Sequence, residues 1–246
     1  MNLIILTAQD CISGSQYSLT DYRAEHIRDI LRASQGDTLE VGLLDGPKGL
    51  GTIIELADEV VLDCEFDSEI IRPAQIIDVV CALPRPQTLK KVLASAACMG
   101  VANIHFIRAK RVEKSYFHSP MLRPEKYTKY LLDGLAQGKN TIMPNVSFNR
   151  YFKRFFEDSL PQIQADGPYR KIIADLDAPT GLTEMNIVST ERIMLAIGPE
   201  GGWVPFEIDF MKNHGFEPFI LGPWTLRVEN ALVATLAQLQ LARKAR

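Results

Sequence analysis

The spacing of apolar positions changes near residue 72, and this change predicts two structural parts. Residues 2–7, "NLIILT", have a short strand pattern. Residues 37–66 alternate apolar runs with Asp-Gly and Gly-Pro turn signals, which is typical of several antiparallel strands. Between them, "SLTDYRAEHIRDILRA" at residues 18–33 has one apolar side and predicts a helix, with Thr20 or Asp21 as its N-cap. Together these elements fit a small β-barrel with one helix.

After residue 73 the chain alternates strand and helix patterns. Helices are predicted near residues 88–100, 124–137, 150–158, 205–215 and 228–245, with strands over 76–83, 103–107, 171–176, 192–197 and 217–221. In the first of these helices the apolar side chains share one face: Leu89, Val92, Leu93, Ala96 and Ala97. The alternation predicts an α/β class fold with a mainly parallel sheet covered by helices, and two domains at residues 1–72 and 73–246.

Composition narrows the class of protein. The 246 residues are 46% hydrophobic and 23% charged, as in ordinary globular chains. No run of about 18 apolar residues is long enough to span a bilayer, and the N-terminus lacks the features of a signal peptide. The four cysteines have no metal-ligand spacing. We therefore expect a cytoplasmic protein with neither a membrane nor a metal partner.

Charge is distributed unevenly along the chain. Residues 1–72 carry 5 basic and 14 acidic side chains, whereas residues 85–126 carry 9 basic and 2 acidic ones. Such a basic concentration suggests a polyanionic partner, although a solvated basic face without a partner would look the same. Four cations near Tyr116 suit RNA phosphates beside a base that stacks on the ring. They are Arg108, Lys110, Arg111 and Lys114.

Two Gly-Pro loops follow predicted strands about 24 residues apart. The first is "AIGPEGG" at residues 196–202, and the second is "LGPWTL" at residues 221–226. Ligands of parallel α/β sheets bind where strands end, and glycines allow the main chain to approach a ligand closely. If the two strands are neighbours, the loops form one cleft. The sequence has neither a P-loop nor a G-x-G-x-x-G motif, which disfavours those forms of nucleotide binding.

"LAIGPEGGW" followed by "LGPWTLRVENAL" resembles the paired signature of the SPOUT-class ribosomal RNA methyltransferases that make N3-methyluridine in 16S rRNA. The resemblance covers nearly the whole chain. "HIRDILRASQGDTLEVGLLDG" is similar to that family's N-terminal PUA-like β-barrel domain, and "ALPRPQTLKKVLASAACMGV" is similar to the opening of its catalytic domain. "RAKRVEKSY" and "GLAQGKNTIMPNV" are similar to its central segments.

The resemblance implies a C-terminal SPOUT α/β domain with a deep trefoil knot, a homodimer, and S-adenosyl-L-methionine as cofactor. It implies methylation of N3 of a uridine in 16S rRNA, in free RNA or in the small ribosomal subunit. Main-chain groups of both loops would hold the cofactor. The cofactor-binding residues so implied are Leu195, Ile197, Gly198, Pro199, Glu200, Gly201, Gly202, Leu221, Gly222 and Leu226.

Methylation of uridine requires loss of the N3 proton and stabilisation of charge on O2 and O4. Arg227 and Glu229 are the leading candidates for electrostatic stabilisation and orientation, and Asn230 could donate to a base carbonyl. A mutual or dimer-interface salt bridge is the alternative for Arg227 and Glu229. The predicted RNA-binding residues are His26, Arg28, Arg32, Arg108, Arg111 and Lys114.

Two other functions remain open on the sequence. One is a non-catalytic RNA-binding or ribosome-assembly protein that retains the fold, which cofactor binding would distinguish. The other is a SPOUT methyltransferase acting on another base or on a ribose hydroxyl, which nucleoside analysis of the rRNA would distinguish.

Overall fold

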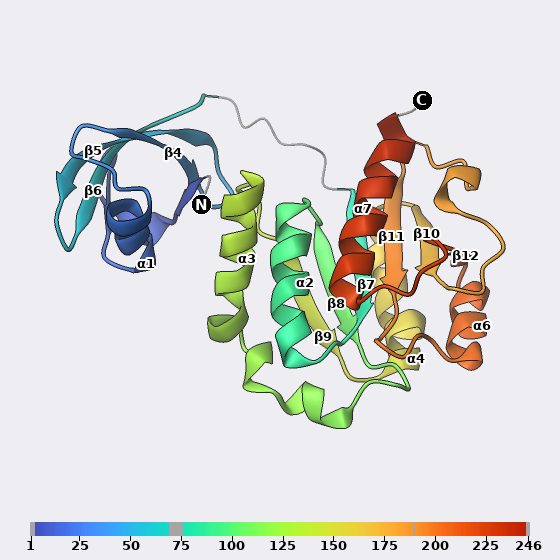
Figure 1. Ribbon diagram of the computed structural model, residues 1–246. Coiled ribbons are helices and arrows are strands. Elements are labelled where there is room, and N and C mark those ends of the chain that lie inside the picture. Colours follow the sequence, from blue (N-terminus) through green and yellow to red (C-terminus); the bar gives the residue numbers. More distant parts are fainter. Residues whose placement is uncertain (1–2, 69–75, 189, 245–246) are drawn as a thin grey trace.

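The computed structural model describes residues 3–68, 76–188 and 190–244, which form two six-stranded sheets (Figure 1). The predicted boundary at residues 72 and 73 lies outside the described residues. The first sheet has the order β1-β4-β5-β6-β3-β2. Its strands are β1 (Ile4–Leu6), β2 (Cys11–Ser13), β3 (Gln16–Leu19), β4 (Thr38–Leu43), β5 (Lys48–Leu56) and β6 (Val60–Phe66). Apart from the parallel pair β1–β4 the pairings are antiparallel, as predicted for residues 37–66.

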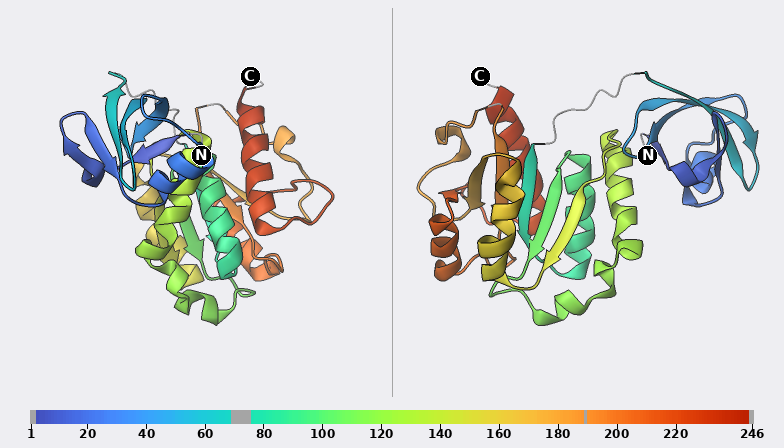
Figure 2. Two further views of the ribbon diagram at one scale, coloured as in Figure 1. Left: turned by 60° about the vertical axis from the view of Figure 1, so that its left-hand side comes forward. Right: turned by 180° about the vertical axis from the view of Figure 1, so that it is seen from behind.

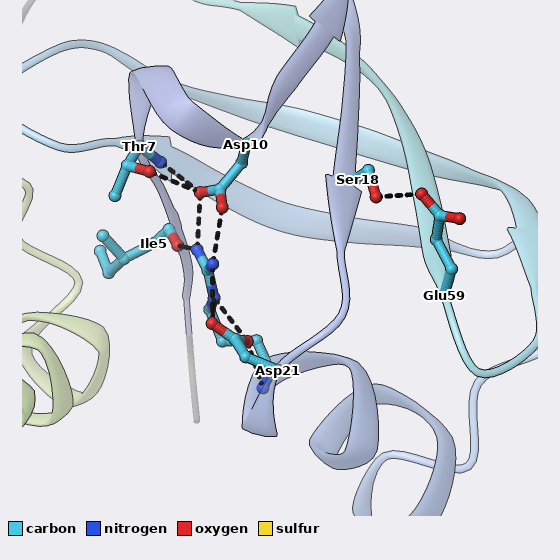
Figure 3. A network of polar contacts seen from close by, with 7 residues as sticks. Ile5, Thr7, Asp10, Ser18, Asp21 and Glu59 are labelled. Atoms are coloured by element: carbon cyan, nitrogen blue, oxygen red, sulfur yellow. Dashed lines mark hydrogen bonds and ion pairs between the residues drawn. The ribbon is translucent and has the colours of Figure 1, made fainter.

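The first sheet holds one short helix, α1 (Tyr22–Glu25), which continues as a wider turn over His26–Ile30. The predicted helix began too early, because Ser18 and Leu19 belong to β3 and pair with β6. Asp21 is the N-cap, as one of the two predicted alternatives, and its carboxylate accepts the backbone N–H of Arg23. The Arg23 guanidinium also contacts Asp10 at 2.7 Å, and Asp10 in turn accepts from Thr7 (Figure 3). This network fixes the helix to the end of β1.

The second sheet is entirely parallel in its described pairings and has the order β12-β10-β11-β7-β8-β9. Its strands are β7 (Ile77–Ala82), β8 (Asn103–Ile107), β9 (Asn145–Asn149), β10 (Tyr169–Ala174), β11 (Arg192–Ile197) and β12 (Glu217–Phe219). The prediction of a mainly parallel sheet is therefore confirmed. The central strands β7 and β11 are buried along almost their whole length, as expected of strands with helices on both faces.

Helices cover both faces of this sheet. One face carries α2 (Pro86–Cys98), α3 (Pro124–Gly138) and α7 (Val228–Lys244) (Figure 1). The opposite face carries α4 (Phe152–Arg154), α5 (Leu160–Ile163) and α6 (Pro205–Asn213), with α4 and α5 joined through Phe155–Ser159 (Figure 2). The predicted helix at residues 150–158 is thus longer at its end. The predicted apolar face of α2 is at most 1% exposed throughout.

Close contacts join the two sheets through the segment that follows α3. The Thr141 hydroxyl donates to the carbonyl of Gly46 at 2.7 Å, and the Asp45 amide donates to the carbonyl of Thr141 at 2.7 Å. The Asp45 carboxylate accepts the Met143 amide at 2.8 Å. Leu3 and Ile5 of the first part are buried in the apolar core of the second. Hydrogen bonds and apolar packing therefore hold the two sheets in a fixed arrangement.

Gly42 of β4 tests this arrangement. A Cβ at Gly42 would lie 2.6 Å from Cγ2 of Thr141, so we expect Gly42→Ala to lower the free energy of unfolding by about 1–3 kcal/mol through overpacking. In a Thr141→Ser background, which removes that methyl group and keeps the hydroxyl, the cost of Gly42→Ala should fall by about half. Urea unfolding of the four proteins measures both costs, and equal costs in the two backgrounds would show that the sheets do not meet here.

Candidate functional site

A cavity of about 450 Å³ lies at the carboxyl ends of β10, β11 and β12. Both Gly-Pro loops line it, from Ile197 to Trp203 on one side and from Leu221 to Val228 on the other. The cleft expected from the two loops therefore exists. The assumption that it requires neighbouring strands was wrong. β11 and β12 are not neighbours, because β10 lies between them. The loops meet across the end of β10, whose own loop supplies a third wall.

The first loop, here called the glycine loop (residues 198–202), is shaped by two of its glycines. Gly202 has a φ of 74°, and its amide closes a turn on the Pro199 carbonyl at 2.8 Å. Gly198 lies against the Trp203 indole, where a Cβ would be 3.1 Å from Nε1. Gly201 does not adopt a positive φ, so its backbone conformation does not require glycine. A Cβ at Gly201 would instead lie 3.0 Å from Cδ of Arg111. The absence of side chains leaves the main chain bare on the cavity wall.

The third wall comes from residues 174–177, after β10, which the sequence reasoning missed. Asp175 and Asp177 both line the cavity, and the Asp175 carboxylate accepts the Asp177 amide at 3.2 Å. The Asp175 amide bonds the Phe219 carbonyl at 3.0 Å, which ties this loop to β12. The signal was present in "KIIADLDAP", where carboxylates follow a buried strand directly. These two groups can accept hydrogen bonds from hydroxyl or ammonium groups of a ligand.

Arg111 belongs to the basic loop (residues 108–114) that follows β8, and it reaches the glycine loop. Its guanidinium donates to the Gly201 carbonyl, and the side chain lines the cavity. The neighbouring Lys110 amide donates to the Glu207 carboxylate at 2.6 Å. Of the other predicted RNA-binding residues in this loop, Arg108 is half-buried and Lys114 is exposed. Arg111 is therefore part of the cavity wall as well as of the basic segment.

The three predicted catalytic residues lie at the start of α7 and do not line the cavity among the described residues. Arg227 and Asn230 are exposed. Glu229 is buried and pairs with Lys91 of α2 at 3.1 Å. Burial opposes ionisation of Glu229, but hydrogen bonds from its own backbone and from Lys91, with the positive charges of Lys91 and Arg227, outweigh burial and lower its pKa. Glu229 thus forms an ion pair with Lys91.

The predicted RNA-binding residues of the first part lie on or beside α1. The Arg28 guanidinium donates to the carbonyls of Ala57 and Asp58 at 2.7 and 2.9 Å. Arg32 is exposed with a φ of 52°, and burial lowers the pKa of His26, which keeps its ring neutral at pH 7. Arg28 therefore supports the β5–β6 turn, and of these three predicted residues Arg32 alone is exposed.

The described residues offer neither a metal site nor a membrane span. No group of three or more His, Cys, Asp or Glu side chains is arranged to hold a metal ion in the described part of the chain. No helix within the described ranges is long and apolar enough to cross a membrane. A second hollow, of about 550 Å³, lies near Arg170 and Glu217 at the amino ends of β10 and β12. It has no glycine loop, so the strand-end cavity is the candidate functional site.

The Glu229–Lys91 pair predicts a pH dependence of stability. Because the pKa of Glu229 is lowered on folding, the pair stabilises the protein above the ordinary value of 4.5 and loses this effect as pH falls through the lowered pKa. We expect Glu229→Gln to reduce the free energy of unfolding by about 1 kcal/mol or less at pH 7, since Lys91 is largely in solvent. The difference from wild type should shrink towards pH 3.5 in urea titrations. In a Lys91→Met background the effect of Glu229→Gln should be small at every pH, and an effect there as large and as pH-dependent as in the wild type would contradict the assignment to Lys91.

Comparison with known proteins identifies relatives along the whole chain. A family described as an RNA methyltransferase domain matches residues 72–240. Ribosomal RNA small subunit methyltransferase E of Treponema pallidum is 28% identical over 242 residues, covering 96% of this chain and 90% of that protein. Ribosomal RNA small subunit methyltransferase E 1 of Borreliella burgdorferi is also 28% identical over 242 residues, covering 95% of each.

Solved structures share the fold. A Legionella pneumophila methyltransferase with bound cofactor SAM matches with a TM-score of 0.77 and 22% identity, covering 98% of each chain. Ribosomal RNA small subunit methyltransferase E from Neisseria gonorrhoeae, bound to S-adenosyl methionine, matches with a TM-score of 0.75 and 17% identity, covering 99% of this chain and 98% of that one. At these identities the structures establish the fold, including both sheets.

Proposed function

The chain belongs to the RNA methyltransferase domain family, and on that premise we propose that it transfers a methyl group from S-adenosylmethionine to N3 of a uridine in 16S ribosomal RNA. Two curated relatives that match nearly the whole chain are named as ribosomal RNA small subunit methyltransferases. The observation that carries the proposal is the cavity at the strand ends, where two glycine-containing loops and two carboxylates meet. The choice of N3 rests on the resemblance of those loops to the family signature.

The cavity fits S-adenosylmethionine in size and in chemistry. Its volume of about 450 Å³ lies within the range usual for sites of small ligands. The bare main chain of the glycine loop can contact polar atoms of the cofactor, and Asp175 and Asp177 can accept from the ribose hydroxyls or the amino group. Leu221 and Leu226 offer apolar contact to the adenine ring. When bound, the cofactor supplies a methyl group on a positively charged sulfur.

The proposed cofactor-binding residues divide by position. Eight of them line the cavity, six from the first loop region and two from the second. They are Ile197, Gly198, Pro199, Glu200, Gly201, Gly202, Leu221 and Leu226. Leu195 is fully buried within β11, and Gly222 adjoins Leu221. We propose that Leu195 acts through the packing of the strand and that the others contact the cofactor directly.

We assign the substrate side to the start of α7. Leu226 and Val228 line the cavity. The exposed Arg227 lies between them in the sequence, and the exposed Asn230 follows, so we place both residues at the mouth of the cavity. Arg227 and Asn230 would stabilise negative charge on O2 and O4 as N3 loses its proton to solvent or to a base. The N3–carbon bond then forms as the carbon–sulfur bond breaks, and the sulfur keeps that electron pair. Glu229, paired with Lys91, would hold this turn in place.

The remaining proposals concern assembly. Residues 1–72 would form a PUA-like RNA-binding domain, and residues 73–246 a SPOUT domain with a deep trefoil knot. The family match begins at residue 72, in support of this division. The protein would be a cytoplasmic homodimer. The dimer is supported by α7, which leaves Val233 and Leu241 38% and 68% exposed. The same helix buries Leu232, Leu236 and Leu239. RNA would contact the basic loop and Arg32, with His26 and Arg28 supporting the surface.

Loss of the gene should remove N3-methyluridine from 16S rRNA. Mass spectrometry of nucleosides from a deletion strain should show that this nucleoside is absent and that the wild-type gene restores it. Unchanged N3-methyluridine, with loss of a ribose methylation or of a different methylated base, would assign the chain to another methyltransferase reaction. An unchanged nucleoside profile, with no cofactor binding by calorimetry, would favour a non-catalytic RNA-binding protein.

Gly201→Val should weaken S-adenosylmethionine binding by at least about 100-fold, because the added side chain would occupy the cavity wall and displace Arg111, whose Cδ would lie 3.0 Å from the new Cβ. The protein should still fold as a dimer. Gly181→Val is the matched control, since a Cβ there has no neighbour nearer than 3.8 Å and Gly181 does not line the cavity. Calorimetry with the cofactor measures both. Normal affinity in Gly201→Val would refute the placement of the cofactor against the glycine loop.

A further inference from the structure

Glu207 connects two segments that the sequence separates widely. Its side chain is 2% exposed. One carboxylate oxygen accepts the Lys110 amide of the basic loop at 2.6 Å, and the other accepts the Val204 amide, just after the glycine loop, at 3.0 Å. A buried carboxylate that serves two backbone amides fixes both segments, because breaking either bond leaves a buried polar group without a partner.

Helix capping accounts for only half of this arrangement. Glu207 is the third residue of α6, and its bond to Val204 is the usual contact of an acidic side chain with the N-cap amide. Capping residues of this type normally lie at the surface and need one contact. The bond to Lys110 and the burial are additional, and the bond attaches a loop that lies 97 positions away in the sequence.

Arg111 makes a second connection between the same two loops. Its guanidinium donates to the Gly201 carbonyl on the cavity wall. The basic loop is thus bound to the glycine loop directly through the side chain of Arg111, and to Val204, just after the glycine loop, through the Lys110 amide and the Glu207 carboxylate. A cofactor that contacts the glycine loop would also restrict the basic loop.

We propose that Glu207 is a positioning residue that couples the two loops, so that cofactor binding and RNA binding strengthen each other. The inference rests on the proposed function, because it takes the cavity as the cofactor site and the basic loop as an RNA surface. Cofactor binding would order the glycine loop, and through Arg111 and Glu207 it would order the cations of the basic loop. The basic loop would then lose less conformational entropy when RNA binds, and the reciprocal effect of RNA on cofactor affinity must be equal.

The experiment measures this coupling directly. Small ribosomal subunits from a strain lacking the gene are titrated with the full-length protein by filter binding, with and without saturating S-adenosylhomocysteine. The ratio of the two dissociation constants is the coupling factor. We expect about tenfold for wild type and less than about twofold for Glu207→Gln, whose amide nitrogen cannot accept one of the two N–H groups. Asp209→Asn, an exposed change on the same helix that also removes one acidic charge, should keep the wild-type factor.

Arg111→Met provides an independent variant, because Arg111 is exposed and its loss should not prevent folding. It should weaken subunit binding in both conditions and also reduce the coupling factor below about twofold. Adding Glu207→Gln to Arg111→Met should change the factor no further, since both act on one connection. A purely structural role for Glu207 would lower both affinities and leave their ratio intact.

The outcomes separate the two proposals. Tenfold coupling retained in Glu207→Gln or in Arg111→Met would overturn the coupling role. A wild-type factor near one, in a protein that methylates the subunit, would overturn it while the proposed function stands. Failure of the wild-type protein to bind S-adenosylhomocysteine or the subunit would defeat the proposed function, and the coupling with it. If thermal unfolding shows that Glu207→Gln does not fold, the coupling factor of Arg111→Met decides whether the two loops are coupled.

Discussion

The close approach of three backbone loops at one edge of a parallel sheet is the constraint on which the site depends. All six strands of the second sheet point the same way, so the loops after β10, β11 and β12 open at the same edge. Side chains at the glycine positions of the loop after β11 would fill the space between them. Glycine at residues 198, 201 and 202 leaves that space as a cavity, and the positive φ at Gly202 turns the chain towards α6. The wall combines the main chain of the glycine loop with apolar side chains and the carboxylates of Asp175 and Asp177.

The charges on the chain are consistent with this site. The acidic excess lies in residues 1–72, and the basic excess lies in residues 85–126, next to the cavity. A polyanion would be attracted to the loop that carries Arg111 and repelled by most of the first sheet. The hydrogen bonds of Asp45 and Thr141 hold the two parts together.

Local patterns in the sequence predicted most of the local features, whereas contacts between distant residues could not be predicted from them. Periodicity was sufficient for the buried face of α2, and the Gly-Pro pairs located both loops, because each signal lies within a few adjacent residues. The position of β10 between β11 and β12 depends on strand order, which no local pattern encodes. The Lys91–Glu229 pair joins residues 138 positions apart. The roles predicted for Arg227, Glu229 and Asn230 stay predictions. The short β2–β3 hairpin was missed because its polar residues resemble a loop.

Glu207 illustrates why such distant contacts matter in a site of this kind. A reaction that depends on positioning needs its loops held to within a fraction of an ångström, yet loops rich in glycine lose much conformational entropy when they are ordered. A second element must therefore hold them. Helix α6 does so through Glu207 in its first turn. The Glu207 carboxylate accepts the Val204 amide, next to the glycine loop, and the Lys110 amide in the basic loop. The flexibility that lets the main chain meet a ligand is thus limited by a rigid helix, and a single side chain transmits that limit to both binding surfaces.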